Sequence, residues 1–488
     1  METAPAPHAY RKELLFNQIW QIANFGSKAG FLLVLTPWMI VKWGTEGYGL
    51  FALASSLLVS MALIDGGVRA LTRLKLAEAL KNEDDAGFRE AFWRGLVTFA
   101  FVASVVFLFA VVLGMTGFLQ TALKLPAGGS VVLVVTVGLT GFYLLSTLAL
   151  EPIAARGKLS LLKAVNTIGA VAAIPACALA LWFNGSVLLV TVFYSLCSIL
   201  PGLVLAYQER LYKIRPPKGF RFADVKVVIH TLRSGVWFYL TTVALILKTH
   251  ALTFVVAAIA GPAEAGIFYI LLRFTEIIGN VGATASETSL ASLASATSPK
   301  AIAGNFRQSW LYVAIFSLYG AAGLICLGRE LLNFWLPKDY LLPAGVLAAM
   351  ALFGLTGAFS RVVVNASMGL NIVKSGAIAN LIEAVVDIGL AAVGYYIAGL
   401  TGVLIGGSLG VFVLMPQARR IAGLGDLTFW NTYLQPLLKL IPGLVISTVI
   451  LALANMSSQP VVWLIAAGAT GIVAVWELRR LHRAPSEV

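Results

Sequence analysis

The chain contains 488 residues, of which 59% are hydrophobic and 12% are charged, and its formal net charge is +13 at pH 7. Soluble domains carry about 25% charged residues, so this composition excludes an ordinary soluble protein. The three cysteines all lie in apolar stretches, which gives no support to a disulfide framework or a metal site.

Apolar runs of the length that crosses a bilayer as a helix recur from one end of the chain to the other. Because a backbone in lipid must satisfy its own hydrogen bonds, we predict an all-α integral membrane protein with about fourteen transmembrane helices. The predicted spans are 14–41, 48–73, 95–118, 131–154, 161–183, 186–207, 234–260, 263–290, 306–328, 341–367, 375–398, 400–418, 434–455 and 460–478.

Lysine and arginine predict the orientation of these spans, because cytoplasmic loops are enriched in both. With the N-terminus inside, 26 of the 35 basic residues fall in inside segments, four fall outside and five fall within helices. This distribution predicts cytoplasmic N- and C-termini. It also accounts for the positive net charge by contact with anionic lipid headgroups, without nucleic acid.

The largest inside loop, 208–233, is basic and contains prolines, and it divides the chain near its middle. We predict a linker there between two bundles. The predicted division is a cytoplasmic N-terminus 1–13, a six-helix bundle 14–207, the linker 208–233, a second six-helix bundle 234–420, two extra helices 421–480 and a tail 481–488.

Two short motifs recur at equivalent positions of the two halves. GYGLFAL at 47–53 is similar to EAGIFYI at 264–270, and AARGKLSLLK at 154–163 is loosely similar to ASMGLNIVK at 366–374. Six helices per half is an even number, so both halves run in the same direction. This is a parallel repeat, a plan common among transporters, and the last two helices are an addition to it.

The segment GTEGYGLFALASSLLVSMALIDGGVRALTR at 44–73 resembles the opening of bacterial polysaccharide-export flippases, and GPAEAGIFY at 261–269 and the six-plus-six-plus-two layout fit as well. That family belongs to the multidrug/oligosaccharidyl-lipid/polysaccharide exporter superfamily. The resemblance implies flipping of an oligosaccharide carried on undecaprenyl diphosphate, from the cytoplasmic to the periplasmic leaflet of the inner membrane. It implies a role in exopolysaccharide or lipopolysaccharide synthesis, with a polysaccharide polymerase as a further partner.

Polar residues inside the predicted spans fall on single helix faces, because residues three and four apart share a face. Such faces are expected to line a bundle interior or a wet cavity. The stripes are Asn17, Gln21, Asn24 and Lys28; Arg273, Glu276, Asn280, Thr284 and Glu287; Arg361 and Asn365; and Asn380, Glu383 and Asp387. Asn17 and Gln21 lie near the inside interface, where solvation explains them equally well.

Four basic residues lie deep in predicted spans, and Lys28 and Lys248 occupy the centre of the first helix of each half. A diphosphate requires fixed positive charge with hydrogen-bond donors. We therefore predict a substrate-binding cavity lined by Lys28, Lys248, Arg273, Arg361, Asn24 and Arg69. Arg273 could instead be neutralised by Glu276. Asp65 with Arg69, and Glu151 with Arg156, could be structural ion pairs.

Glu383 and Asp387 are paired carboxylates at mid-depth of one span. Two close carboxylates in a low dielectric do not easily both ionise, so one is expected to hold a proton or a cation. This predicts ion coupling, to protons or sodium, through Glu383, Asp387 and Glu276. The alternative is a salt bridge from the carboxylates to Arg361 on the preceding span.

No P-loop, nucleotide fold or metal-ligand cluster is recognisable, so we expect no cofactor, no catalytic residue and no metal site. Three alternatives to a flippase stay open: a multidrug or small-molecule exporter of the same superfamily, a permease of the other large six-plus-six class, and a membrane-embedded glycan polymerase or ligase. The last would need a sizeable outside loop, whereas the predicted outside loops are short.

Overall fold

The computed structural model confirms the all-helical class: the residues that it describes form helices and turns, with no β-strand among them. These described residues are 7–60, 68–156, 158–183, 185–216, 236–276, 298–336, 345–370, 372–424, 428–457 and 459–483. Of the residues singled out in the sequence, Asp65, Asn280, Thr284, Glu287 and most of the linker 208–233 lie outside the described part.

The chain forms two compact units. Unit 1 comprises Met1–Tyr239 with Ala257–Gly266, and unit 2 comprises Leu240–Val256 with Ile267–Val488. The boundaries between the two units fall within residues 236–276. This segment contains α10 (Val236–Ile246), the π-helical turn η3 (Leu247–Ala251), α11 (Leu252–Ala260) and a helix over 262–276.

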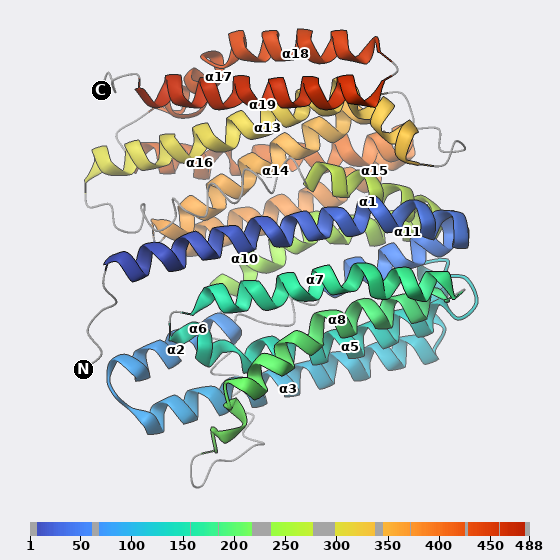
Figure 1. Cartoon of the computed structure of the whole chain (residues 1–488), viewed down its shortest axis with the longest axis vertical. Coiled ribbons are helices and arrows are strands. Elements are labelled where there is room, and N and C mark those ends of the chain that lie inside the picture. The colour runs from blue at the N-terminus through green and yellow to red at the C-terminus, as the bar shows by residue number, and fades with distance from the viewer. Residues whose placement is uncertain are drawn as a thin grey trace. The chain divides into compact units, whose positions relative to one another are not determined.

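Unit 1 is a bundle of long helices with short ones at the turns (Figure 1). Its elements are α1 (Pro7–Ser60), α2 (Val68–Lys81), α3 (Asp85–Met115), α4 (Phe118–Ala122), α5 (Gly129–Ala149), α6 (Glu151–Ala155), α7 (Leu159–Trp182), α8 (Val187–Gln208) and η2 (Leu211–Lys213). Helix α1 packs on α5, α7 and α8, and α5 packs on α3 and α8.

Unit 2 is built around three long helices, α13 (Pro299–Trp335), α14 (Val346–Gly369) and α15 (Val373–Leu409). The elements that follow α15 are η4 (Gly410–Leu414), α16 (Met415–Leu424), η5 (Trp430–Leu434), α17 (Gln435–Leu438), α18 (Ile441–Asn455) and α19 (Pro460–Arg483). Helix α14 packs between α13 and α15, and α18 and α19 pack on each other and on α13 (Figure 1).

Several helices begin at a side-chain cap, which satisfies backbone N–H groups that the first turn leaves without a helical partner. Asp84 Oδ1 accepts a hydrogen bond from Gly87 N at 2.8 Å, before α3. Ser298 Oγ accepts from Ala301 N at 3.2 Å, before α13. These polar residues therefore mark where the chain enters an apolar helix.

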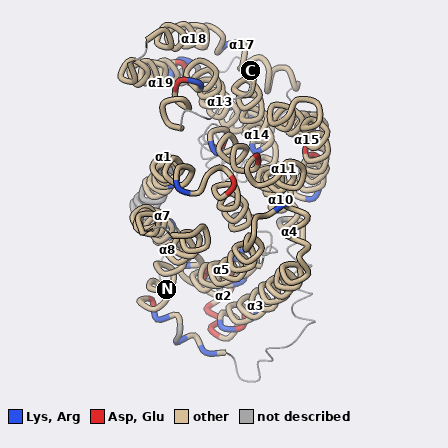
Figure 2. Tube along the Cα trace, turned by 90° about the vertical axis from the view of Figure 1, so that its right-hand side faces the viewer, with Lys and Arg blue, Asp and Glu red and all other residues tan. Residues whose placement is uncertain are grey.

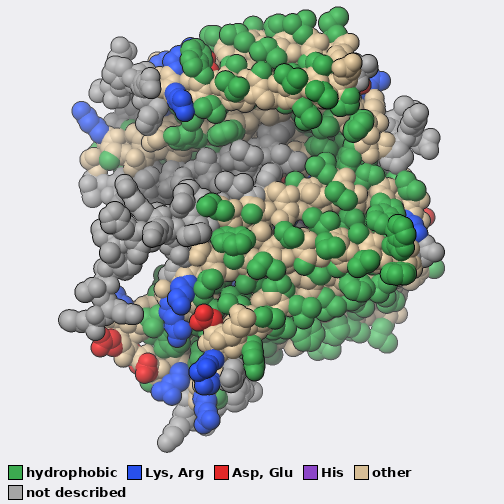
Figure 3. Space-filling model, in the orientation of Figure 1, with side chains coloured by type: hydrophobic (Ala, Val, Ile, Leu, Met, Phe, Trp, Pro, Cys, Tyr) green, Lys and Arg blue, Asp and Glu red, His purple; other side chains and the backbone are tan. Residues whose placement is uncertain are grey.

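Helix length and apolarity fit a membrane. Within the described residues, nine helices are long and apolar enough to cross a bilayer, or ten if one bent pair counts as a single span. Charged positions are sparse along the trace in Figure 2. In Figure 3, hydrophobic side chains cover the visible helix faces, and basic side chains of unit 1 gather at the end where α2 and α6 lie. Such a surface is the one that lipid requires.

Two interruptions of the helices within the predicted spans of 375–455 have a clear structural cause. The predicted spans 375–398 and 400–418 are separated as expected: α15 is interrupted at Ala398 and at Gly399, which has φ 58°. The predicted span 434–455 is not one straight helix, because the chain bends by 41° between Leu438 and Ile441. Pro442 lies in the first turn of α18 and cannot continue the preceding helix, which explains the bend.

The first motif of the internal repeat marks a backbone contact in unit 1. A Cβ added to Gly49 would lie 1.7 Å from the carbonyl oxygen of Pro262, and one added to Gly266 would lie 3.0 Å from the Cα of Gly49. The segment of α1 after the kink at Gly44 and the helix over 262–276 therefore touch backbone to backbone. Only glycine permits this approach.

Candidate functional site

The Lys248 side chain is presented by a π-helical turn. The turn, Leu247–Ala251, interrupts the α-helix formed by α10 and α11, and both Lys248 and His250 are buried in it. Short π-helical turns occur often at functional positions, since the extra residue re-aims side chains. Here, two positions apart in the chain, the two side chains contact different acidic residues.

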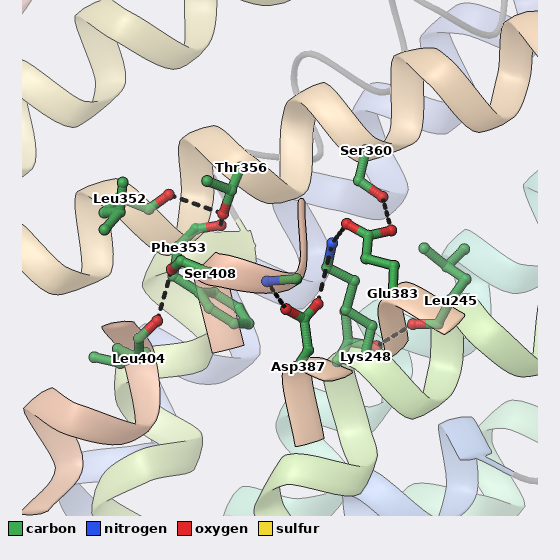
Figure 4. A network of polar contacts seen from close by, with 12 residues as sticks. Leu245, Lys248, Leu352, Phe353, Thr356, Ser360, Glu383, Asp387, Leu404 and Ser408 are labelled. Atoms are coloured by element: carbon green, nitrogen blue, oxygen red, sulfur yellow. Dashed lines mark hydrogen bonds and ion pairs between the residues drawn. The ribbon is translucent and has the colours of Figure 1, made fainter. Parts of the chain in front are cut away.

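Lys248 reaches two carboxylates on α15 (Figure 4). Its ammonium donates a hydrogen bond to Glu383 Oε1 and lies 3.3 Å from Asp387 Oδ2. Ser360 Oγ donates to Glu383 Oε2 at 2.8 Å, and the backbone N–H of Gly410 donates to Asp387 Oδ1 at 2.8 Å. We call Lys248, Ser360, Glu383 and Asp387 the carboxylate cluster.

The charged side chains of the carboxylate cluster are buried. The residue exposures are 4% for Lys248 and 0% for both Glu383 and Asp387. The predicted stripe on α15 is thus a buried face, since Asn380 is only 1% exposed. Gly410 admits this packing: a Cβ there would lie 2.2 Å from Asp387 Oδ1. Ions buried this deeply require partners, because desolvation costs several kcal/mol per ion.

The partner of both carboxylates is one that the sequence interpretation did not name. The sequence predicts either a bound proton or cation, or a salt bridge to Arg361. The structure instead pairs Glu383 and Asp387 with Lys248. The available signal was the depth of Lys248 in an apolar span, together with two acids at similar depth elsewhere. A charge buried so deeply needs a counter-charge, but helical spacing within one span does not show which other span supplies it.

A second polar cluster in unit 2 contains Arg273, Glu276, Tyr269 and His250. Arg273 Nη1 donates to Glu276 Oε2 at 2.6 Å, which confirms the ion pair that the i, i+3 spacing suggested. The guanidinium also lies 4.5 Å from the centre of the Tyr269 ring and donates to its hydroxyl. His250 Nε2 is 3.9 Å from Glu276 Oε1. Arg273 is thereby held in one orientation, with 24% of its side chain exposed.

A small pocket in unit 2 adjoins both clusters. Its volume of about 30 Å³ exceeds the roughly 10–15 Å³ that one water molecule needs. Its polar lining residues are Lys248, Thr249, Thr275, Glu276, Ser360 and Arg361. The pocket accommodates water or a small ion rather than a sugar.

In unit 1, Arg69 belongs to an ion-pair network at the end of α2. Arg73 donates to both oxygens of Glu151, at 2.6 and 3.0 Å, and Arg69 Nε lies 3.3 Å from Glu151 Oε1. Glu151 is 1% exposed. The expected pairing of Glu151 with Arg156 is wrong: the Arg156 guanidinium instead lies 6.0 Å from the centre of the Phe88 ring. Five residues along the chain do not place two side chains on one helix face.

The other predicted residues of unit 1 lie on α1. Lys28 is exposed and Asn24 is half-buried, whereas the side chains of Asn17 and Gln21 lie outside the described part. Lys28 and Lys248 belong to different units. Their convergence on one substrate therefore stays a prediction.

The chain has the fold of solved membrane transporters, one of which is described as a member of the MOP superfamily. Its long apolar helices make it a multi-pass membrane protein. A structure described as lipid II flippase MurJ in an inward closed conformation has a TM-score of 0.70 and 16% identity, covering 95% of this chain and 99% of that chain. An inward-facing MATE multidrug resistance transporter of the MOP superfamily has a TM-score of 0.65 and 13% identity, covering 83% and 99%.

The MATE multidrug transporter DinF-BH has a TM-score of 0.60 and 16% identity, covering 86% of this chain and 97% of that chain. No family model and no curated protein matches the chain. At such low identities, likeness establishes the fold and leaves the substrate to be inferred from the site.

Proposed function

We propose that the protein flips a polyprenyl-diphosphate-linked oligosaccharide from the inner to the outer leaflet of the bacterial inner membrane, for surface polysaccharide biosynthesis. Transport proceeds by alternating access through a cationic central cavity. The observation that carries the proposal is the set of basic side chains placed in apolar helices, namely Lys28 on α1, Arg361 on α14 and Arg273 on the helix over 262–276. The sequence resemblance at 44–73 and the shared fold with a lipid II flippase also support it.

These basic residues suit a diphosphate in different ways. Lys28 is exposed, Arg361 lines the pocket of unit 2, and Arg273 is oriented by Tyr269 and Glu276. Arg side chains bind phosphate oxygens in a planar, two-point geometry, and Lys binds them as a point charge. Asn24 and Arg69 complete the proposed substrate site. Lys248 would join it only in a conformation that frees it from Glu383 and Asp387.

We expect Lys28→Ala to slow flipping roughly tenfold or more, because a charge-assisted hydrogen bond of about 1.5–3 kcal/mol is lost. The assay uses vesicles that contain the purified protein and a fluorescent undecaprenyl-diphosphate-linked oligosaccharide. Lys28→Arg should retain most activity. Lys42→Ala, an exposed lysine of the same helix outside the predicted stripe, serves as the matched control. Wild-type flipping by both Lys28→Ala and Lys248→Ala, at normal protein levels, would refute the cationic site.

A multidrug exporter is the second candidate, because MATE transporters share the fold. The two functions separate in cells. Loss of a flippase leaves complete lipid-linked repeat units in the inner leaflet and leaves dye efflux unchanged. Loss of a multidrug exporter raises dye retention and leaves the lipid-linked pool unchanged. Repeat units trapped in the outer leaflet would indicate a polymerase instead.

We propose that Glu383, Asp387 and Glu276 couple flipping to an ion gradient. The carboxylate cluster holds two acids and one base within a buried site, so one further positive charge would balance it. Asp387→Asn should therefore reduce the dependence of flipping rate on an imposed proton or sodium gradient. The measurement compares initial rates in vesicles with and without each gradient, and an unchanged dependence would count against coupling through Asp387.

A further inference from the structure

The carboxylate cluster has the composition of a binding site for a monovalent cation. Glu383 and Asp387 supply carboxylate oxygens, and Ser360 supplies a hydroxyl oxygen. Oxygen ligands of this kind suit hard cations. In the structure the cation in this site is the ammonium of Lys248.

We propose that this cluster is a monovalent-cation site that the chain fills with its own Lys248. The wild-type protein then takes up no free Na⁺ at these carboxylates in the described conformation. Removal of the ammonium would expose the site to Na⁺ or to a small organic ammonium ion. The proposal concerns cation binding at equilibrium, so it holds whatever substrate the protein moves.

The site is built by separate elements that fix each ligand. Glu383 and Asp387 are one turn apart on α15, Ser360 comes from α14, and Lys248 comes from the π-helical turn. Ser360 and the N–H of Gly410 each hold one carboxylate oxygen, and the Lys248 ammonium lies against the remaining oxygen of each carboxylate. The ligand positions are therefore largely set without the lysine.

Charge and space both favour a replacement cation. Two carboxylates with one ammonium leave a formal surplus of one negative charge, and loss of the ammonium would raise it to two. Burial makes the second uncompensated charge costly, which favours uptake of one cation at the place that the ammonium has left. Lys248 and Ser360 also line the pocket of about 30 Å³. Truncating Lys248 to alanine would extend that pocket to the carboxylates and give a small ion a path.

The test measures the thermal unfolding temperature of purified Lys248→Ala in detergent, with NaCl, LiCl, ethylammonium chloride or choline chloride at equal ionic strength. A ligand that binds only the folded state raises its stability as the ligand concentration rises. We expect Na⁺ or ethylammonium to raise the unfolding temperature of the alanine variant above its value in choline. Wild type should show no such difference.

Matched variants define the site. Lys248→Met fills the space without charge and should not respond to Na⁺, and Lys248→Ala combined with Glu383→Gln should lose the response. If the alanine variant does not fold in choline, the yield of monodisperse protein purified in Na⁺ becomes the measurement. The proposal would be overturned if Na⁺ changed the unfolding temperatures of wild type and Lys248→Ala equally, or did not change that of Lys248→Ala. If the variant does not fold in choline, a yield that Na⁺ does not raise would overturn it. Failure of flipping would leave this binding result untouched.

Discussion

Replacing Lys248 with methionine is expected to lower the free energy of unfolding by about 3–5 kcal/mol. Methionine has a similar length, so the change removes the charge and leaves most of the packing. The loss follows from geometry: the ammonium contacts both Glu383 and Asp387, and neither carboxylate is exposed to water. Without it, two negative charges would remain buried one helical turn apart. Chemical or thermal unfolding of the purified protein measures the loss.

A double-mutant cycle separates the ion pair from general packing. The second change is Glu383→Gln, which keeps the shape of the side chain that Lys248 and Ser360 contact. We expect the double variant to be less destabilised than the sum of the two single variants. Lys248→Met alone leaves two buried carboxylates without their cation, whereas with Glu383→Gln only Asp387 stays charged. Additive losses would show that Lys248 and Glu383 do not stabilise each other in the folded protein.

The second large effect is expected at Gly49. Its substitution by alanine would place a Cβ 1.7 Å from the carbonyl oxygen of Pro262, so the helix backbones must separate. Overpacking of this kind costs about 1–3 kcal/mol, and more where backbone rather than a side chain must move. We therefore expect a lower unfolding temperature and lower yield of folded protein.

Gly26→Ala is the matched control on the same helix. Nothing lies within 4 Å of a Cβ added to Gly26, so there the better helix propensity of alanine, worth roughly 0.5–1 kcal/mol, should be neutral or stabilising. If Gly49→Ala proves as stable as Gly26→Ala, the backbone contact with Pro262 is not tight in the folded protein.

The Gly49 contact also gives the internal repeat a physical meaning. The sequence places Gly49 and Gly266 at corresponding positions of two similar motifs, and the structure brings them together at the crossing of two helices. A glycine at each position allows the two backbones to approach closely, which side chains of any size would prevent. Sequence similarity alone could not show that the two copies touch each other.

The sequence by itself determined the class of protein, most helix positions and the buried face of α15. These features depend on local pattern: a bilayer demands long apolar helices, and residues three and four apart share a face. The bend near Pro442 was also readable in principle, because proline acts on its own helix. The predicted span 434–455 does not include this bend, because the span was identified by its hydropathy and the residues on both sides of the bend are apolar.

Only the tertiary structure decided which charges meet. Lys248 and Glu383 are 135 positions apart in the chain, and helical periodicity fixes the face of each residue but not the helix that this face contacts. The same limit explains why Glu151 was paired with Arg156 rather than with Arg69 and Arg73. A buried ion is stable only beside a partner of opposite charge. Which residue becomes that partner depends on how segments that are distant in the sequence pack together.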